Sequence, residues 1–274
     1  DMARVRFIEI AYDDTWLRDS GPITLRADGA FRLLDFRFTG WGGKFDASRD
    51  DRLIEGLFEA GIFLNSSRHP IDFALEGGAI DSDGAGTLLT TWTCLHERHP
   101  DAERSQLAAQ LGDWLTQDRV LWLDHGYLEG DDTDAHIDTL ARFAAEDAIV
   151  FQGCDDPTDS HYAELQAMAA ELAALRTRDG RPYRLFPLPW SKPIVDDARR
   201  LAASYANFLI INGAVLMPAY GSDADGRRVD AEAVSVLERA FPDREIVTVP
   251  CRPLIWQNGS LHCVTMQLPQ GLVA

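Results

Sequence analysis

Basic residues are scarce in this chain of 274 residues, where 26 lysines and arginines are outnumbered by 44 aspartates and glutamates. The net charge of −18 at pH 7 would repel the phosphates of nucleic acid, which excludes nucleic acid as a partner. An acidic surface can steer a small cationic substrate toward a binding site. Taken alone, however, the acidity is explained more simply by solubility.

Long apolar runs are also missing. No stretch of about 18 residues is continuously apolar, so the sequence predicts no membrane span, and residues 1–10 lack the pattern of a signal peptide. The cysteines Cys94, Cys154, Cys251 and Cys263 form no Cys-x-x-Cys pair and have no histidine at zinc-ligand spacing. The acidic run 131–138 lacks the glycine and final glutamate of a calcium loop. We therefore expect reduced thiols in a cytoplasmic protein, with no metal and no cofactor.

A polar cluster, a β-hairpin, an α-helix and a further strand recur along the chain in that order. Turn residues between short apolar runs predict hairpins that turn at Ala27–Gly29, Asp83–Gly84, Ala145–Asp147 and Asn212–Gly213. Apolar residues at helical spacing predict helices over 47–60, 102–116, 160–176 and 230–241, the last capped by Asp230. Closing strands are expected at 61–64, 119–123, 183–188 and 245–249, and residues 5–10 would close a fifth unit.

One polar residue stands near the start of each successive hairpin, at separations of 57, 60, 71 and 56 positions. These residues are Asp19, Glu76, His136, Asn207 and Cys263. A unit of this size repeated five times suggests a ring, in which equivalent positions converge on the axis. The predicted fold class is therefore α/β: a five-bladed, pseudo-symmetric α/β propeller of ββαβ units, forming a single domain over residues 1–274.

The fifth unit is incomplete, because the sequence stops shortly after the strand expected from Leu261 and residues 5–10 supply only a closing strand. We expect an N-terminal segment, made of a hairpin strand and a helix, that this sequence lacks. The alternative is a ring with an open seam, which would expose sheet edges.

Cys263 lies in the stretch Gln257–Pro269, after a turn that contains Gly259 and at the start of the expected strand. Considered alone, such a cysteine is more often a small buried apolar residue. A cysteine, a histidine and several carboxylates without a metal instead indicate nucleophilic catalysis. Neighbouring acids would raise the pKa of the thiol, and a cationic substrate would reverse that effect. A guanidinium held between Asp19 and Asp138 fits, because paired carboxylates bind it through bidentate hydrogen bonds.

His136 is the expected proton carrier. It would protonate the departing ammonia and then activate water, while Glu76 would orient the imidazole and stabilise its charged form. His136 and Asp138 are two positions apart, so on a strand their side chains would share one face.

Each candidate also has a plainer interpretation. Asp19 could form a surface ion pair with Arg18, Glu76 could be a turn residue, and His136 could be structural. Asn207 could serve only the backbone, and Trp16 and Trp41 could be core residues, which is the more natural interpretation for Trp41.

The motifs that carry these residues resemble the agmatine deiminase and bacterial-type peptidylarginine deiminase family of the guanidine-modifying superfamily, over residues 5–269. They are Trp16–Pro22, Leu75–Gly78, Asp132–Asp138, Ser204–Asn207 and Gly259–Cys263. The resemblance implies a propeller fold, a nucleophile at Cys263, an acid/base at His136 and its partner at Glu76. It also implies guanidinium ligands at Asp19 and Asp138 and a substrate path lined by Trp16, and we count Arg18 and Asn207 as further substrate-binding candidates.

The implied activity is that of a C–N hydrolase acting on linear amidines. It would convert agmatine to N-carbamoylputrescine and ammonia through a covalent cysteine intermediate, a step of putrescine biosynthesis. The stretch Gln257–Cys263 departs from the Gly-Gly-Gly-Asn-Ile-His-Cys run of agmatine deiminases, which leaves free or peptide-bound arginine as an alternative substrate. A cysteine-dependent amidinotransferase and a non-catalytic guanidine-binding protein are further alternatives. The expected partner is a cationic guanidinium small molecule, and a homo-oligomer is compatible with the sequence.

Overall fold

Four three-stranded sheets of one topology recur along the chain in this computed structural model, which describes residue 2 and residues 5–273. In each sheet an antiparallel hairpin is followed by a third strand parallel to its second strand. The four sheets are β1 (Ile23–Ala27), β2 (Ala30–Arg37) and β3 (Ser66–Ala74); β4 (Ile80–Ser82), β5 (Thr87–Thr91) and β6 (Arg119–Leu123); β7 (Ala141–Ala145), β8 (Ala148–Gln152) and β9 (Arg184–Leu188); and β12 (Leu209–Ile210), β13 (Ala214–Ala219) and β14 (Glu245–Pro250). The predicted α/β class and the repeated hairpin are thereby confirmed.

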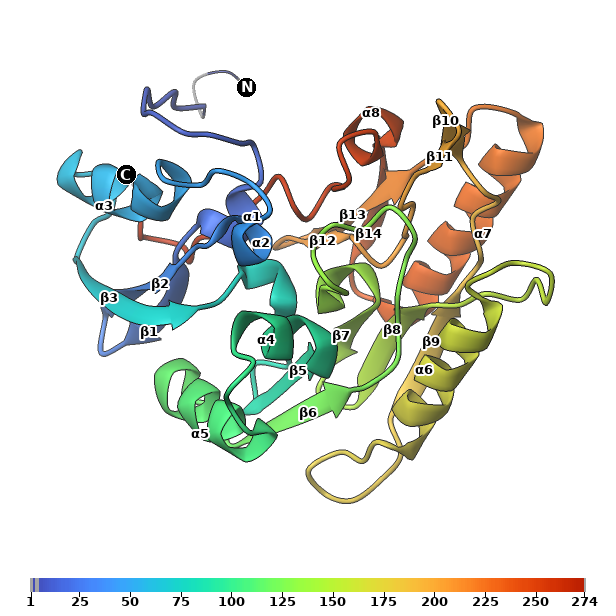
Figure 1. Cartoon of the computed structure of the whole chain (residues 1–274), viewed down its shortest axis with the longest axis horizontal. Coiled ribbons are helices and arrows are strands. Elements are labelled where there is room, and N and C mark those ends of the chain that lie inside the picture. Colours follow the sequence, from blue (N-terminus) through green and yellow to red (C-terminus); the bar gives the residue numbers. More distant parts are fainter. Residues whose placement is uncertain (1, 3–4, 274) are drawn as a thin grey trace.

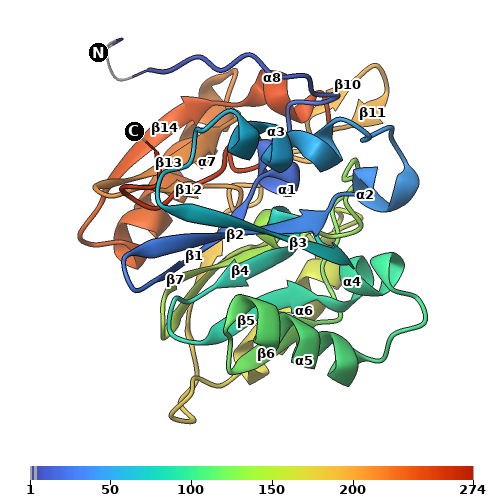
Figure 2. The same ribbon diagram turned by 90° about the vertical axis from the view of Figure 1, so that its left-hand side faces the viewer.

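Helices join the second strand of each sheet to the third, as a parallel pair requires. The connecting helices are α3 (Leu53–Glu59), α5 (Arg104–Leu115), α6 (Tyr162–Ala174) and α7 (Ala224–Ala240). The long helices α5, α6 and α7 lie on the outside of the molecule (Figure 1), and the sheet of β1–β3 lies next to that of β4–β6 (Figure 2). The shorter elements are α1 (Leu17–Ser20), α2 (Gly40–Gly43), η2 (Asp50–Arg52), η3 (Gly77–Ala79), α4 (Trp92–Arg98), η4 (Ile137–Thr139), α8 (Arg252–Ile255) and the hairpin β10 (Val195–Asp196) with β11 (Arg199–Arg200).

The core lies between neighbouring repeats, because each long helix packs on its own sheet and also on the sheet before it. Helix α5 packs on β2 and β3, α6 packs on β5 and β6, and α7 packs on β8 and β9. On α5 the buried stripe is Leu107, Leu111 and Leu115, spaced four residues apart as one face of a helix requires. A capping box of Glu103 and Gln106 satisfies the first backbone N–H groups of this helix. Of the described residues, no helix is both long and apolar enough to cross a membrane.

Three expected element boundaries are wrong. Residues 5–10 form no strand, because no described strand pairs with them, and most of their side chains are exposed. The strand expected at 61–64 begins instead at Ser66, after Gly61 has ended α3 with a positive φ of 67°. Helix α7 begins at Ala224, where the side chain of Asp223 accepts a hydrogen bond from Gly226 N at 2.7 Å. Asp230 lies inside that helix, and its carboxylate binds Tyr220 N at 3.1 Å.

Two site segments also differ from expectation. His136 and Asp138 flank and occupy the 3-10 helix η4 rather than a strand. Residues 261–264 form a turn, in which His262 N donates to Asn207 O at 3.2 Å and Thr265 N donates to His262 O at 3.1 Å. No strand begins at Cys263, because the first bond holds its segment against Asn207 and the second closes a turn within it. Closure of a five-bladed propeller stays a prediction.

Candidate active site

Five short segments, one from each expected unit, meet at one place. Gly78 N donates to Asp19 Oδ1 at 3.0 Å, and Glu76 Oε2 lies 3.8 Å from His136 Nε2. The amide of Asn207 donates to Asp138 O and to Cys263 Sγ, both at 3.3 Å. Arg18 N donates to Cys263 O at 3.0 Å, so the contacts pass from each unit to the next and return to the first. The structure thus brings together the five residues that the spacing singled out.

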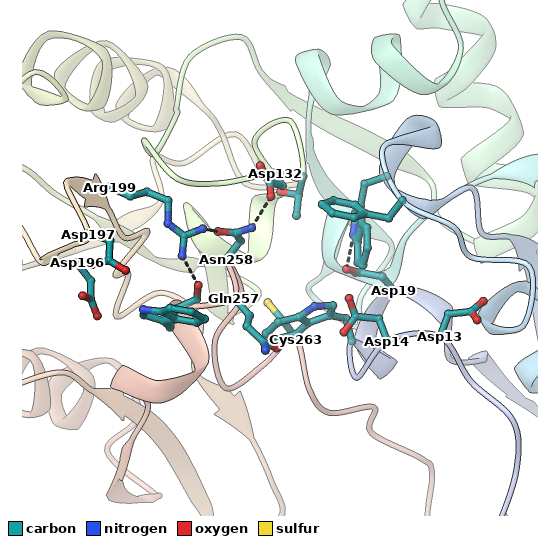
Figure 3. A pocket seen from close by; sticks show the side chains of 16 residues that line it. Asp13, Asp14, Asp19, Asp132, Asp196, Asp197, Arg199, Gln257, Asn258 and Cys263 are labelled. Atoms are coloured by element: carbon teal, nitrogen blue, oxygen red, sulfur yellow. Dashed lines mark hydrogen bonds between the residues drawn. The ribbon is translucent and has the colours of Figure 1, made fainter.

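Above this meeting point lies a cavity of about 680 Å³. Figure 3 shows Cys263 at its floor, with Asp19 on one side and Asn258 and Asp132 on the other. Trp16 and Trp41 line the same floor. Further out the cavity is acidic, with Asp13, Asp14, Asp132, Asp196 and Asp197 along its wall and Arg199 as its basic member. Such a wall favours a positively charged ligand.

Cys263 is buried, with 5% of its surface exposed. Its Sγ lies 3.8 Å from Asp138 Oδ2 and within 3.5 Å of the side-chain amide of Asn207. Burial, followed by the negative charges of Asp138 and Asp19, raises the pKa of the Cys263 thiol well above its usual value. Without a bound cation, Cys263 is therefore a neutral thiol at neutral pH.

Asp19 is held by two donors. Trp41 Nε1 donates to Oδ2 at 2.9 Å and Gly78 N donates to Oδ1 at 3.0 Å. Gly78 must be a glycine, because a Cβ there would lie 2.6 Å from His136 Nδ1 and 2.8 Å from Asp19 Oδ1. Burial raises the pKa of Asp19, although the charge of His136 and the bond from Trp41 oppose that shift.

Trp41 binds Asp19 and lines the cavity, which its sequence context did not lead us to expect. A signal was present in the glycines at positions 40, 42 and 43. They surround a bulky residue that adopts a positive φ of 57°, a strained conformation typical of functional sites.

Asp138 is fully buried and only half satisfied. Its Oδ2 binds His262 Nδ1 at 2.8 Å, whereas its Oδ1 has no hydrogen-bond partner among the described residues. Burial raises the pKa of Asp138 to about 6. Burial, with the charges of Arg142 and Arg18, lowers the pKa of His262 well below its usual value, so His262 is neutral. Its Nδ1–H therefore donates to Asp138, a role that the sequence analysis missed.

His136 lies between two carboxylates, with Nδ1 3.7 Å from Asp19 Oδ1 and Nε2 3.8 Å from Glu76 Oε2. Burial lowers the pKa of His136, but Asp19, Cys94 and Glu76 together outweigh it and raise the pKa well above its usual value. The other oxygen of Glu76 accepts from Arg98 Nε at 2.7 Å. Burial opposes ionisation of Glu76, yet His136 and Arg98 lower its pKa. The imidazole is consequently charged, and Arg98 is a second partner that the sequence analysis missed.

The two remaining candidates for substrate binding, Trp16 and Arg18, differ in where their side chains lie. Trp16 lines the cavity, where its ring packs so closely on Gly259 that a Cβ there would lie 2.3 Å from the ring. Arg18 points elsewhere: its Nε donates to His262 O at 3.3 Å and its Nη2 contacts Thr265 and Gln267. Its guanidinium therefore forms hydrogen bonds with the segment that carries Cys263 and does not line the cavity.

Residues 1–269 match the family described as Porphyromonas-type peptidyl-arginine deiminase. The chain belongs to that family. It is 36% identical over 299 residues to the agmatine deiminase of Stutzerimonas stutzeri, an alignment that covers 100% of this chain and 79% of the relative. The putative arginine deiminase from Porphyromonas gingivalis matches its structure with a TM-score of 0.94 and 49% identity, covering 100% of this chain and 80% of that one.

A substrate-bound Cys-to-Ser variant of C. jejuni agmatine deiminase matches with a TM-score of 0.88 and 37% identity, covering 96% of this chain and 76% of that one. The resemblance in the sequence motifs is thus confirmed, and the protein is an enzyme of this deiminase family. The roles of its individual residues stay predictions.

Proposed function

We propose that the protein is an agmatine deiminase, which hydrolyses the guanidino group of agmatine to the ureido group of N-carbamoylputrescine and releases ammonia. The observation that carries the proposal is the arrangement at the cavity floor. The Sγ of Cys263 lies 3.8 Å from one oxygen of Asp138, whose other oxygen has no hydrogen-bond partner among the described residues. A guanidinium bound there by Asp138 and Asp19 would present its central carbon to the thiol.

Binding of the cation activates the nucleophile. The guanidinium charge offsets the two carboxylates that keep the Cys263 thiol protonated, so the thiol loses its proton to solvent. The thiolate attacks the guanidinium carbon and forms a tetrahedral adduct. His136, charged in the free enzyme, protonates the leaving nitrogen, and ammonia departs as the C–N bond breaks.

The second half of the reaction uses water. The neutral His136 takes a proton from a water molecule as that water attacks the carbon of the covalent intermediate. The second adduct loses its hydroxyl proton to solvent as it collapses to the ureido product, and the C–S bond breaks to release the thiolate. Once the neutral product has left, the thiolate takes up a proton from solvent and the free enzyme is restored. Glu76, oriented by Arg98, stabilises the imidazolium at each stage. Agmatine and water are consumed, and N-carbamoylputrescine and ammonia are formed.

Agmatine is the preferred substrate in this proposal because it also carries a cation at its far end. The outer wall of the cavity presents Asp13, Asp14, Asp132, Asp196 and Asp197, which suit a primary ammonium. The test is ammonia release from agmatine, free arginine and a peptide with an internal arginine, measured side by side. Cys263→Ala should abolish turnover while agmatine still binds, and Cys251→Ala, a matched loss of a buried thiol, should not. Undiminished turnover by Cys263→Ala would refute the mechanism.

One observation favours a second candidate, a deiminase that forms citrulline from free or peptide-bound arginine. Arg199 lies in the otherwise acidic wall, where its guanidinium donates to Asn258 Oδ1 at 3.0 Å. A guanidinium in that place could receive the carboxylate of an arginine substrate. In that case Arg199→Met would lose arginine turnover and keep agmatine turnover. Ammonia formed without any amine acceptor would exclude an amidinotransferase.

The proposal includes a cytoplasmic location and a single domain. The four cysteines, which the structure shows as free thiols, are suited to a reducing compartment. The proposed partner is the guanidinium substrate and not nucleic acid. A homo-oligomer stays a prediction that sedimentation equilibrium would test.

A further inference from the structure

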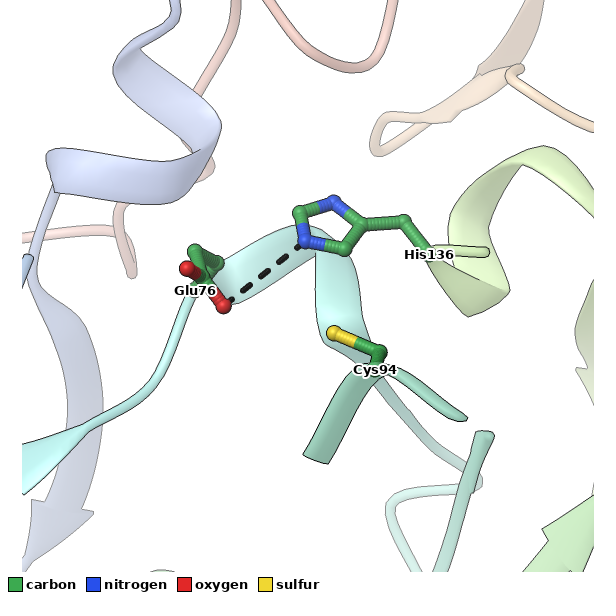
Figure 4. A group of neighbouring side chains, drawn as sticks. All are labelled: Glu76, Cys94 and His136. Atoms are coloured by element: carbon green, nitrogen blue, oxygen red, sulfur yellow. Dashed lines mark ion pairs between the residues drawn. The ribbon is translucent and has the colours of Figure 1, made fainter. Parts of the chain in front are cut away.

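A second cysteine, Cys94, lies beside the imidazole of His136. Cys94 stands in the first turn of α4 and is fully buried. Its Sγ, one carboxylate oxygen of Glu76 and one ring nitrogen of His136 all lie within 4.8 Å of one another. Figure 4 shows the three side chains grouped together. The proposed reaction uses Glu76 and His136, whereas it gives Cys94 no role.

Two of these three ligand atoms form an ion pair with each other but have no hydrogen bond among the described residues. Glu76 Oε2 and His136 Nε2 are buried atoms without a hydrogen bond within the part of the chain that the structure describes, and they face each other at 3.8 Å. The side chains of both residues are 1% exposed. Buried polar atoms are nearly always hydrogen-bonded. Two buried atoms that lack hydrogen bonds and could bind a metal, next to a thiol, are therefore an unusual arrangement. Arg98 occupies Glu76 Oε1 and thereby leaves Oε2 turned toward His136.

A thiolate, an imidazole and a carboxylate are the ligands of zinc and of chemically similar divalent ions, whereas calcium and magnesium prefer oxygen alone. Zinc–ligand bonds of about 2.0–2.3 Å place neighbouring tetrahedral ligands roughly 3.3–3.8 Å apart. The separation of His136 Nε2 and Glu76 Oε2 is 3.8 Å, so small side-chain shifts would suffice. The carboxylate and a Cys94 thiolate together balance a charge of +2.

The surroundings of the cluster support a cation in spite of one nearby positive charge. The guanidinium of Arg98 is already paired with Asp134, to which Nη1 donates at 2.7 Å. Asp19 lies 3.7 Å from the opposite ring nitrogen of His136, where a carboxylate commonly orients a metal-bound histidine. We propose that Glu76, Cys94 and His136 form a binding site for zinc(II) or a similar ion that inhibits the enzyme.

The proton balance explains the inhibition. A binding ion displaces one proton from Cys94 Sγ and one from His136 Nε2, and both protons pass to solvent. The imidazole then keeps a single N–H, on Nδ1, and can no longer take up and return a proton during turnover. Because the three donors are buried, the ion enters only when the cluster opens, so inhibition should develop slowly. The ion is an inhibitor and not a cofactor.

Binding is tested without any catalytic activity, by titrating cobalt(II) into Cys263→Ala. This variant lacks the other thiol at the site, so a thiolate-to-cobalt absorption band in the near ultraviolet should come from Cys94. The band should disappear in Cys94→Ala/Cys263→Ala and persist in the matched variant Cys251→Ala/Cys263→Ala. Cys94→Ser/Cys263→Ala, which keeps the side-chain volume, should also lack it. An absent band, or a band that survives loss of Cys94, overturns the proposal.

Inhibition is tested on the active enzyme incubated with zinc(II) before substrate is added. The zinc concentration for half-inhibition should rise at least about tenfold in Cys94→Ala and in Cys94→Ser, as expected for loss of one ligand, and a chelator should restore wild-type activity. Equal zinc sensitivity of these variants would show that the inhibiting ion binds without Cys94 and would refute the inhibitory role of this cluster. This arm depends on the proposed function, whereas the cobalt titration decides the site even if no deiminase activity is found.

Discussion

Replacing Trp41 by phenylalanine tests whether the indole N–H holds Asp19 ready for a guanidinium. The change removes the bond from Nε1 to Asp19 Oδ2 at 2.9 Å and leaves the bond from Gly78 N. A phenyl ring still fills the place against Phe38 and Phe45, whose ring centres lie 5.0 and 5.6 Å away. A hydrogen bond to a charged group contributes about 1.5–3 kcal/mol. We therefore expect kcat/KM to fall by about tenfold to a hundredfold.

The same substitution should change the pH profile. Burial already raises the pKa of Asp19, and loss of a donor raises it further, so the acid limb of kcat/KM should move to higher pH. The assay is ammonia release from agmatine over about pH 5 to 9. Trp114→Phe is the control, since that indole packs on Phe73 and has no hydrogen bond among the described contacts. A Trp41→Phe enzyme with wild-type kcat/KM and an unmoved acid limb would refute the reasoning.

Three further predictions follow from the buried charges and close contacts. Because the pKa of Asp138 is raised to about 6 and its ionised form binds the guanidinium, kcat/KM of the wild type should fall as pH drops below about 6; a profile flat to pH 5 would contradict this. Gly259→Ala should displace Trp16, since the new Cβ would lie 2.3 Å from its ring, and should raise KM while leaving Tm nearly unchanged. An unchanged KM would count against a substrate path past Trp16. Arg98→Met leaves the buried Glu76 carboxylate without its partner at 2.7 Å, so the free energy of unfolding should fall by about 3–5 kcal/mol in urea titrations. A loss below about 1 kcal/mol would show that Glu76 finds another partner or takes up a proton.

Local patterns were enough to predict the repeat and the meeting of its five polar residues. The turn at Asn212–Gly213 is an example, because few sequences other than Asn-Gly adopt a tight hairpin turn so readily, and the hairpin of β12 and β13 is where it was expected. The separations between repeats then predicted which residues share the centre, since equivalent positions of a ring converge.

Local patterns were not enough to predict the hydrogen-bond partners of those residues. Trp41 and Arg98 each bond a residue 22 positions earlier in their own repeat, and His262 bonds Asp138 of a different repeat. No neighbour in the sequence specifies the direction of these side chains. The spacing of His136 and Asp138 suits a strand and a 3-10 helix equally, and tertiary hydrogen bonds decide between them.

The hydrogen bond from Arg18 N to Cys263 O joins residues from nearly opposite ends of the printed sequence. Contacts of such long sequence separation form late and make folding slow. During synthesis Cys263 also leaves the ribosome after the other four central residues. A half-made chain therefore lacks the proposed nucleophile, and in an unfolded chain the Cys263 thiol is separated from Asp19, Glu76 and His136. The proposed site is complete only when this long-range contact has formed, so deiminase activity would also serve as an assay for completed folding.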